Sequence, residues 1–464
     1  MTTGTEPAAN PLGSDIVQRA MREGTVAEWL QQAGIRSVHL GLVDASGVLR
    51  SKRLEPTGAT RAFEEGWSFI DAIQWWGPDD TLWRHAGAAS QRVEVDPGSG
   101  RPYPFAGDAA FFFAEFTPPL CQLSPRFQLL RMAERADAAG LGVRVGWEFE
   151  CIVLEEPSPI GTGFWPERRD PLTPAMKANR CWSALTPATE DRTLGSLIDA
   201  LGAGGVPVDH VCAELGPGCV EIATAPEDAV RSADSAALAK LYTKAHFARD
   251  GRRATFMAQL GSEFPGLGGH PSLSLHSSVD GTPLLCDEPG VLSKIGAQAI
   301  AGVLRLLPEL LAMAAPYPNS YRRFGPGNWA PTTATWGVGN YSCALRAVLD
   351  HPRSARLELR VPGADTSPHH CLAMFLAAAL WGIEECLELP PPVVAPADGR
   401  HVFERPPLPR DLVQAADRFG ASTTARELFG EAFVEHYAAA RQIEAAACHR
   451  FVSAEEQDRY VDYV

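Results

Sequence analysis

Apolar residues alternate strictly with other residues along positions 143–151, and this pattern constrains the fold more than any other feature of the chain. The apolar positions are Val143, Val145, Trp147, Phe149 and Cys151. Because successive side chains of a strand point to opposite faces of its sheet, Glu148 and Glu150 project together from the other face. Two interpretations fit this segment alone: a half-exposed strand whose charges lie in water, or a strand whose carboxylates line a site.

A second pair of carboxylates flanks a glycine-rich turn. Gly216-Pro217-Gly218 separates two strand-like runs, and folding the chain about this turn places Glu214 opposite Glu221. Like charges that face each other across a ladder destabilise it, and a cation between them removes that cost. The alternative is a looser, solvated turn in which the two carboxylates splay apart.

Residues 356–360 alternate in the same way as the first strand. Arg356, Glu358 and Arg360 share one face, and two leucines share the other. This pattern fits a plain surface ladder. In a cleft it would instead supply a metal ligand beside two anion-binding groups, since the arginine fork suits phosphate and carboxylate.

His270 follows the glycine-rich loop 265–269, although a lone histidine is more often structural than a ligand. Together, five clustered carboxylates and one imidazole suit hard divalent ions such as Mg²⁺ or Mn²⁺, and the imidazole favours Mn²⁺. A site for zinc alone would need more histidine or cysteine. Several such ions beside arginines are typical of phosphoryl transfer, in which catalysis consists mostly of positioning and charge neutralisation.

The pattern along the chain predicts an α+β protein in three parts: an N-terminal extension with a first helix (1–35), a small β-rich domain (36–118) and a large domain (119–464). The expected elements are a hairpin at 36–55, helices at 125–140, 226–249, 290–315 and 370–388, and strands at 143–154 and 254–259. Helices rich in Ala and Glu end the chain.

Composition limits the classes of protein and partner. The chain has 464 residues, of which 45% are hydrophobic, as in a globular protein. Its net charge of −15 repels phosphate backbones and anionic membranes, so we expect no nucleic-acid or membrane partner. The longest apolar run, 371–383, is too short to span a bilayer, and we expect a cytoplasmic protein. The ten cysteines form no CxxC pair and are expected to be reduced thiols in packed positions.

These segments occur in an order that resembles the glutamine synthetase family. The matching motifs lie at 146–150, 214–221, 268–270, 319–323 followed by Pro326-Gly327, and 356–360. The resemblance runs from about residue 36 to the C-terminus. It implies an N-terminal β-grasp domain and a catalytic domain whose curved antiparallel sheet, flanked by helices, forms a funnel open to ATP. It also implies a homo-oligomer, a dodecamer of two stacked hexameric rings with active sites shared between neighbours.

The resemblance also assigns roles to residues, position by position. Two or three Mg²⁺ or Mn²⁺ ions would be bound, the first by Glu150, Glu214 and Glu221 and the second by Glu148, His270 and Glu358. The substrate carboxylate would be held by Arg323, Arg360 and Gly266, and ATP by Arg346, Arg356 and Ser274. The implied catalytic residues are Arg323, Arg346, Glu214 and Asp71.

Departures from the family pattern lie on the acceptor side. Ammonia-using members carry a flap glutamate in a Pro-Gly-Tyr-Glu-Ala-Pro motif, and this chain has Trp329 there. Ser272 replaces a histidine, Tyr341 an arginine, and Pro265 a loop asparagine. An indole and a phenol in place of charged groups favour a larger, less polar nucleophile.

The aromatic stretch near Asp71 corresponds to a region that, in the family, comes from the neighbouring subunit. Asp71 is the candidate for the carboxylate on the amine side. Trp67, Trp75 and Trp76 are expected to pack in a core rather than line the pocket, because aromatic residues are commonest in cores.

Three functions are consistent with these residues. The leading hypothesis is an ATP-dependent ligase that forms a γ-glutamyl amide from glutamate and an organic amine through a γ-glutamyl phosphate. An ordinary glutamine synthetase that uses ammonia is the runner-up, which the missing flap glutamate disfavours. The third is a catalytically inactive structural or regulatory relative, and the retained carboxylate cluster argues against it.

Overall fold

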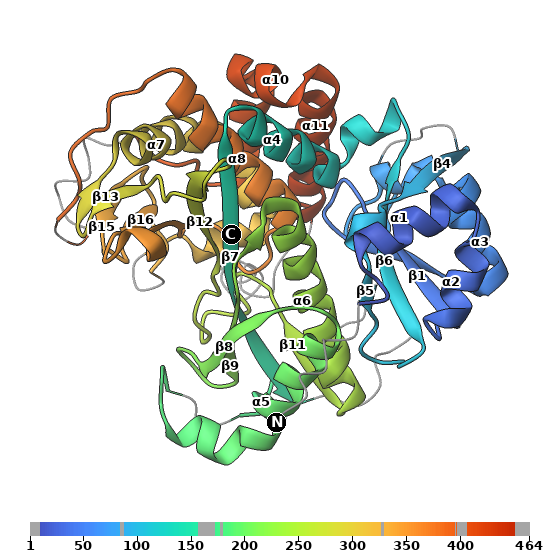
Figure 1. Ribbon diagram of the computed structural model, residues 1–464. Helices are drawn as coiled ribbons and strands as arrows, with labels where there is room; N and C mark the ends of the chain where they lie inside the picture. The colour runs from blue at the N-terminus through green and yellow to red at the C-terminus, as the bar shows by residue number, and fades with distance from the viewer. Residues whose placement is uncertain are drawn as a thin grey trace, which may run out of the picture.

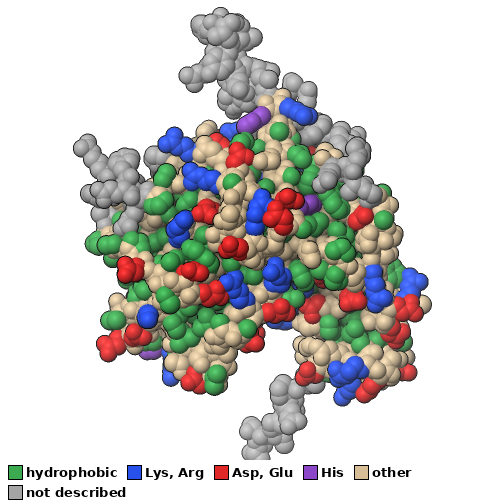
Figure 2. Space-filling model, turned by 90° about the horizontal axis from the view of Figure 1, so that it is seen from above, with side chains coloured by type: hydrophobic (Ala, Val, Ile, Leu, Met, Phe, Trp, Pro, Cys, Tyr) green, Lys and Arg blue, Asp and Glu red, His purple; other side chains and the backbone are tan. Residues whose placement is uncertain are grey.

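The computed structural model describes residues 10–83, 88–155, 172–176, 180–325, 329–394, 396 and 406–450. Two sheets organise the chain, and Figure 1 shows the smaller, N-terminal one beside the larger. On the face shown in Figure 2, the described acidic and basic side chains are interspersed rather than gathered by sign.

The smaller sheet has the strand order β2-β1-β6-β4-β3, with β5 beside β6. Its elements are α1 (Ser14–Glu23), α2 (Val26–Gln32), β1 (Ser37–Val43), β2 (Leu49–Leu54), α3 (Pro56–Glu65), β3 (Trp67–Ile70), β4 (Ser90–Val95), β5 (Arg101–Pro102) and β6 (Ala109–Phe116). The antiparallel β1–β2 pairing confirms the hairpin, whereas β1 and β6 are parallel. Trp29 of α2 packs edge-on against Phe63 and Phe112, so the N-terminal helices share a core with this sheet.

The larger sheet has nine strands in the order β15-β16-β17-β12-β7-β9-β8, with β10 and β11 also paired to β7. The strands are β7 (Leu141–Glu155), β8 (Val208–Ala213), β9 (Cys219–Thr224), β10 (Glu227–Asp228), β11 (Arg252–Thr255), β12 (Gly269–Ser277), β15 (Trp336–Val338), β16 (Leu345–Val348) and β17 (Arg356–Leu359). The pairings are antiparallel except for β15 with β16. A separate hairpin joins β13 (Cys286–Glu288) and β14 (Val291–Leu292).

Helices pack on the apolar face of the larger sheet, some directly against its strands and others against those helices. They are α4 (Pro125–Ala138), α5 (Leu185–Ala203), α6 (Ala229–Arg249), α7 (Lys294–Ala314), α8 (Pro368–Glu384), α9 (Leu412–Ala421), α10 (Thr423–Phe429) and α11 (Glu431–Cys448). Val145, Trp147 and Phe149 of β7 share one core cluster with residues of α7 and α8. The carboxylates of β7 therefore face away from the helices.

Helix α7 is long and apolar enough to cross a membrane, but 72% of its apolar window is buried within the protein. Its Gly302 lies so close to α8 that an added Cβ would come within 2.6 Å of the Gly382 Cα atom. Such burial and close packing are typical of a core helix.

Two expectations need correction. The strand expected at 254–259 ends at Thr255, because β11 and β12 pair with the same edge of β7 and β12 occupies that edge from Leu141 to Phe149. The ten cysteines are free thiols, but Cys181, Cys386 and Cys448 are exposed rather than packed.

The hairpin turn of the small sheet docks against the helical part of the rest of the chain, at α8, α11 and Tyr317. Gly47 has φ 81°, and a Cβ there would lie 2.4 Å from the Ser367 Cβ, next to the start of α8. The Tyr317 hydroxyl donates to the Ser46 carbonyl at 3.0 Å, and Arg441 donates to the Ser46 hydroxyl at 3.2 Å. Glycine is needed at this contact for both its backbone conformation and its size.

Candidate active site on the polar face of the large sheet

A cavity of about 550 Å³ opens on the polar face of the large sheet. Glu148 and Glu150 of β7 both line it, as the alternating pattern predicts. In the sheet register, Glu150 lies directly opposite Glu221 of β9, and Glu148 lies opposite His270 of β12. The two carboxylates thus belong to a shared pocket and not to a plain solvated face.

The predicted pairing of Glu214 with Glu221 is wrong in its register. Cys212 of β8 is the residue opposite Glu221, and Glu214 lies in the turn, where its amide donates to the Cys219 carbonyl at 3.1 Å. Gly216 and Gly218 have φ values of 101° and 74°, and these set the offset. The facing carboxylates in this sheet are therefore Glu150 and Glu221.

Glu214 nevertheless lines the cavity and has partners of its own. Its carboxylate accepts a hydrogen bond from the Trp182 indole N–H at 2.8 Å and one from the Cys181 thiol at 3.3 Å. Glu214 is still close enough to Glu221 to repel it, as predicted, because this repulsion adds to the effect of burial in raising the pKa of Glu221.

Glu148, His270 and Glu358 form the predicted second ligand group. Their donor atoms all lie within 4.8 Å of one another. The Glu358 carboxylate also accepts hydrogen bonds from Arg346 and Arg360. Burial, reinforced by nearby arginines, holds the pKa of His270 well below its usual value, so the imidazole is neutral as a metal ligand must be.

Burial and mutual repulsion raise the pKa values of the carboxylates in the cavity. Burial, followed by repulsion from Glu148, Glu150 and Glu214, raises the pKa of Glu221 to about 8. Burial and repulsion from Glu358 raise the pKa of Glu148 to about 7, and burial raises that of Glu150. A divalent cation among these oxygen donors would relieve the repulsion, so the residues fit the expected Mg²⁺ or Mn²⁺ ions.

Four arginines line the same cavity: Arg323, Arg346, Arg356 and Arg360. Arg323 is buried, donates to the Val361 carbonyl at 3.0 Å and lies 3.1 Å from the His270 Nε2 atom. Arg360 donates to the Tyr341 carbonyl at 2.7 Å. The Arg346 guanidinium stacks 3.8 Å from the centre of the Tyr341 ring. Backbone and aromatic contacts thus hold these cations beside the carboxylates.

Aromatic and apolar side chains form the rim of the cavity. Trp329 and Tyr341 line it, together with Pro265 and Gly266. Trp182 and Leu215 also line it, although nothing in the local sequence pattern marks them. The two tryptophans are 70% (Trp182) and 62% (Trp329) exposed, and both have positive φ, at 53° and 51°. Residues 326–328 of the flap motif lie outside the described residues.

Four predicted site residues do not line this cavity: Glu358, Ser272, Asp71 and Ser274. The Ser272 side chain lies between Gly146 and Glu358 in the sheet, and its buried hydroxyl has no partner among the described residues. Asp71 begins the 3₁₀ turn η1 (Asp71–Trp75), where it accepts from the Ala89 amide at 3.0 Å. Trp75 contacts His436 of α11, as the packing interpretation expects.

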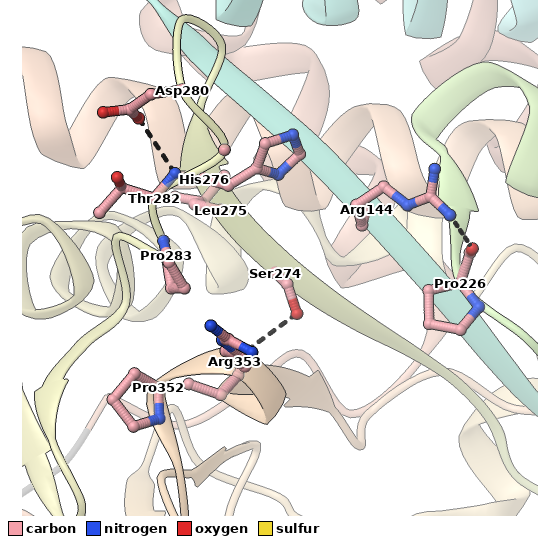
Figure 3. A pocket seen from close by; sticks show the side chains of 12 residues that line it. Arg144, Pro226, Ser274, Leu275, His276, Asp280, Thr282, Pro283, Pro352 and Arg353 are labelled. Atoms are coloured by element: carbon pink, nitrogen blue, oxygen red, sulfur yellow. Dashed lines mark hydrogen bonds between the residues drawn. The ribbon is translucent and has the colours of Figure 1, made fainter.

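Ser274 lines a second cavity, of about 710 Å³, shown in Figure 3. Arg144 and Arg353 also lie along it, and the Ser274 hydroxyl donates to the Ala355 carbonyl at 2.8 Å. Ala355 lines this cavity, and the next residue of the chain, Arg356, lines the first one.

Comparisons with known proteins identify the relatives of the chain. The family model of the glutamine synthetase catalytic domain matches residues 122–460. The chain is 30% identical over 458 residues to a glutamate–isopropylamine ligase of a Pseudomonas species, covering 95% of this chain and 98% of that one. It is 34% identical over 363 residues to γ-glutamylethanolamide synthetase GlnA4 of Streptomyces coelicolor, covering 76% and 75%.

More distant relatives share the whole fold. A glutamine synthetase of Mycobacterium tuberculosis is 28% identical over 460 residues, covering 94% of this chain and 98% of that one. Among solved structures, GmaS in complex with ADP aligns with a TM-score of 0.82 at 23% identity, covering 94% and 99%. From the family model, the relatives and the fold together, we conclude that the chain belongs to the glutamine synthetase family.

Proposed function

We propose that this protein is an ATP-dependent ligase that joins the γ-carboxylate of glutamate to an organic amine. Two relatives at 30% and 34% identity are named for reactions with isopropylamine and ethanolamine. The observation that carries the proposal is the apolar lining of the cavity, where Trp329 stands in place of the flap glutamate and Trp182 and Leu215 are further lining residues.

The reaction requires activation, because a free carboxylate and an amine do not condense readily in water. ATP phosphorylates the γ-carboxylate, the amine attacks the acyl phosphate, and ADP and phosphate leave. In this scheme Arg323 and Arg360 bind the glutamate carboxylates, since each presents a guanidinium to the cavity. Arg346 and Arg356 hold the ATP phosphates and the transferred group.

Two or three divalent ions complete the site in this proposal. Glu148, His270 and Glu358 would hold one ion, and Glu150 and Glu221 would hold another with Glu214 beside them. When bound, such ions neutralise the charge of the phosphate oxygens. The repulsion that raises the pKa of Glu221 supports this arrangement.

The second cavity is the proposed site of the nucleotide. Ser274, Arg353 and Ala355 line it, and Arg356, which follows Ala355 in the chain, lines the carboxylate cavity. A nucleotide there would extend its phosphates toward Arg356 and Arg346, so that its distal phosphate meets the glutamate.

The test is phosphate release from ATP with glutamate across a panel of ammonium, ethanolamine, alkylamines, arylamines and polyamines. We expect an alkylamine or arylamine to give a higher kcat/KM than ammonium, with an amide of matching mass as product. A Glu221→Gln variant serves as the inactive control. A kcat/KM for ammonium equal to or above that of every amine would favour an ordinary glutamine synthetase, and absence of metal-dependent ADP formation would favour an inactive relative.

The proposal also covers the oligomeric state and the cellular location. We propose a dodecamer of two stacked hexameric rings, in which a β-grasp N-terminal domain (36–118) completes the site of a neighbouring catalytic domain (119–464). The position of Asp71 and its aromatic neighbours outside the cavity of their own chain is compatible with such sharing. The proposed location is the cytoplasm.

A further inference from the structure

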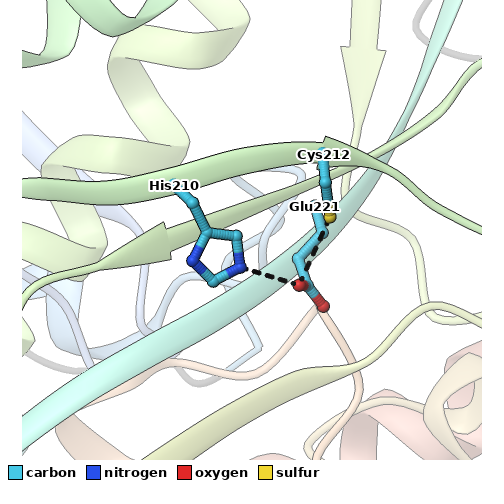
Figure 4. Close-up of side chains that lie close together, drawn as sticks. All are labelled: His210, Cys212 and Glu221. Carbon is cyan, nitrogen blue, oxygen red and sulfur yellow. Dashed lines mark hydrogen bonds and ion pairs between the residues drawn. The ribbon is translucent and has the colours of Figure 1, made fainter. Parts of the chain in front are cut away.

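We propose that this protein has a binding site for a thiophilic divalent ion, such as Zn²⁺, formed by His210, Cys212 and Glu221. This site goes beyond the amide-forming activity and differs in donor chemistry from the two ligand groups described above. It shares Glu221 with the Glu150, Glu214 and Glu221 group, but neither of those groups contains a sulfur ligand. Figure 4 shows the three side chains converging from the paired strands β8 and β9.

The strand geometry brings the three donors together. His210 and Cys212 are two residues apart on β8, and Cys212 lies directly opposite Glu221 in the β8–β9 register. The Glu221 Oε1 atom is 3.4 Å from the His210 Nε2 and 3.7 Å from the Cys212 Sγ. All three ligand atoms lie within 4.8 Å of one another.

These separations suit a tetrahedral ion. Zinc bonds to nitrogen, oxygen and sulfur are about 2.0–2.3 Å long, which places the donors of one tetrahedral ion roughly 3.3–3.8 Å apart. The two measured separations fall in that range. A nitrogen, a thiolate and a carboxylate with one open position form a donor set that zinc accepts and Mg²⁺ does not favour.

The surroundings of His210 orient it for binding. Its Nδ1 atom lies 3.0 Å from the Asp209 carboxylate, which fixes the ring and leaves Nε2 directed at Glu221. Metal-binding histidines commonly have a carboxylate partner of this kind. His210 and Glu221 also line the carboxylate cavity, so an ion can enter from it.

The test uses Co²⁺ as a spectroscopic probe on the full-length protein, with Mg²⁺ present to occupy the Glu148, His270 and Glu358 group, which shares no residue with the proposed site. We expect one equivalent of Co²⁺ to produce a thiolate-to-cobalt charge-transfer band that Zn²⁺ then abolishes. Cys212→Ser should lose the band and weaken Zn²⁺ binding at least tenfold, since even outer ligands cost about 10–100-fold. His210→Gln, at a half-exposed position, should keep the band and weaken binding at least tenfold.

Two matched cysteine variants sharpen the result. Cys181→Ser and Cys448→Ser, at exposed positions, should retain both the band and the affinity for zinc. A wild-type protein without the band, or a Cys212→Ser protein that keeps it, overturns the proposal. Loss of the band in Cys181→Ser also overturns it, because the thiolate would then be the wrong one. These readouts need no turnover, so they are independent of the proposed ligase activity.

Discussion

We propose that Trp329, which lines the cavity, selects the nucleophile of the reaction. Losing a close charge partner costs an ammonium ion about 1–3 kcal/mol, or about ten- to a hundredfold in affinity. An organic amine recovers about 0.8 kcal/mol for each methylene that it buries against the indole. Three or four carbons would therefore offset the loss, which favours alkylamines and arylamines over ammonia.

Trp329→Glu should therefore shift the preference toward ammonia. We expect the ratio of kcat/KM for ammonium to that for butylamine to rise by about ten- to a hundredfold. The control is Trp329→Phe, which keeps an apolar ring and should leave the ratio within about threefold. An unchanged ratio in Trp329→Glu would remove Trp329 from the acceptor pocket.

Arg360 and Arg353 offer a paired test of the two cavities. Arg360→Lys keeps the charge but loses the planar fork that also donates to the Tyr341 carbonyl, so it should raise the KM for glutamate at least about tenfold. Its KM for ATP should change much less. Arg353→Lys, in the second cavity, should show the reverse pattern. Equal effects on both substrates in both variants would contradict the assignment of the cavities.

At the scale of residues, the lining of the cavity was predictable for side chains whose direction follows from the alternation along a strand. Glu148, Glu150 and Arg356 all line it for that reason. The residue opposite Glu221 was not predicted correctly, because the register of β8 against β9 depends on two glycines of the turn that have positive φ. Trp182 and Cys181 escaped as well, because they reach Glu214 across more than thirty residues of chain without any periodic pattern.

At the scale of elements, the facing carboxylates of β7 and β9 make the stability of the metal-free protein depend on pH. The pKa of Glu221 is about 8 and that of Glu148 about 7 in the folded state, against 4.5 for an ordinary glutamate. The folded state therefore holds more protons than the unfolded one in this window. The contribution of these groups to stability is fully present below about pH 4.5 and is lost as the pH rises through about 8.

A divalent cation should reverse that loss. Mn²⁺ or Mg²⁺ at about 100 times its Kd adds about 2.7 kcal/mol, which corresponds to a rise in melting temperature of roughly 3 °C for a chain of 464 residues. We expect a larger rise at pH 8 than at pH 6, because the carboxylates are then ionised. Glu221→Gln should flatten the pH dependence of the metal-free melting temperature and reduce the response to metal. A melting temperature indifferent to both cation and chelator would count against the site.

The β1–β2 hairpin should be sensitive to any side chain at its turn. Gly47→Val combines a positive φ with a clash against Ser367, and we expect a loss of about 2–4 kcal/mol in unfolding free energy. Gly24→Val is the matched control, because Gly24 has φ 67° and nothing within 4 Å of its Cβ. Its cost should be limited to about 1–2 kcal/mol. Equal shifts in the denaturation midpoints of the two variants would contradict the tight contact.

Whether a segment forms a helix or a strand was predictable wherever the pattern of apolar residues is regular. The hairpin at 36–55 and the strand β7 appear where alternation is regular, and the long helices appear where apolar residues are dense. The end of β11 was not predictable, because it depends on which strand occupies the β7 edge. Such competition between distant segments leaves no local signal.

At the scale of the whole molecule, the question is whether one chain contains a complete site. The carboxylates and arginines of the cavity come from β7, β9, β16 and β17, from the turn before β9 (Glu214), from the residue after β17 (Arg360) and from the 3₁₀ turn Pro318–Arg323. Asp71 and its aromatic neighbours lie beside the small sheet, outside this cavity. A contribution from Asp71 to the amine pocket would therefore have to come from another subunit. Dilution to monomers should then abolish activity while the fold remains.

Mixing two inactive variants tests this sharing directly. Asp71→Asn removes the carboxylate that one subunit would contribute to its neighbour's amine pocket, and Glu221→Gln removes a metal ligand. Each homo-oligomer should therefore be inactive. In rings reassembled from an equal mixture, about one site in four combines an intact cavity with an intact neighbour, and we expect about a quarter of wild-type activity. Mixing Glu221→Gln with Glu150→Gln should restore none, because both changes lie in the same cavity. If the first mixture also stays inactive although light scattering shows mixed rings, or if a monomer is fully active, each site belongs to a single chain.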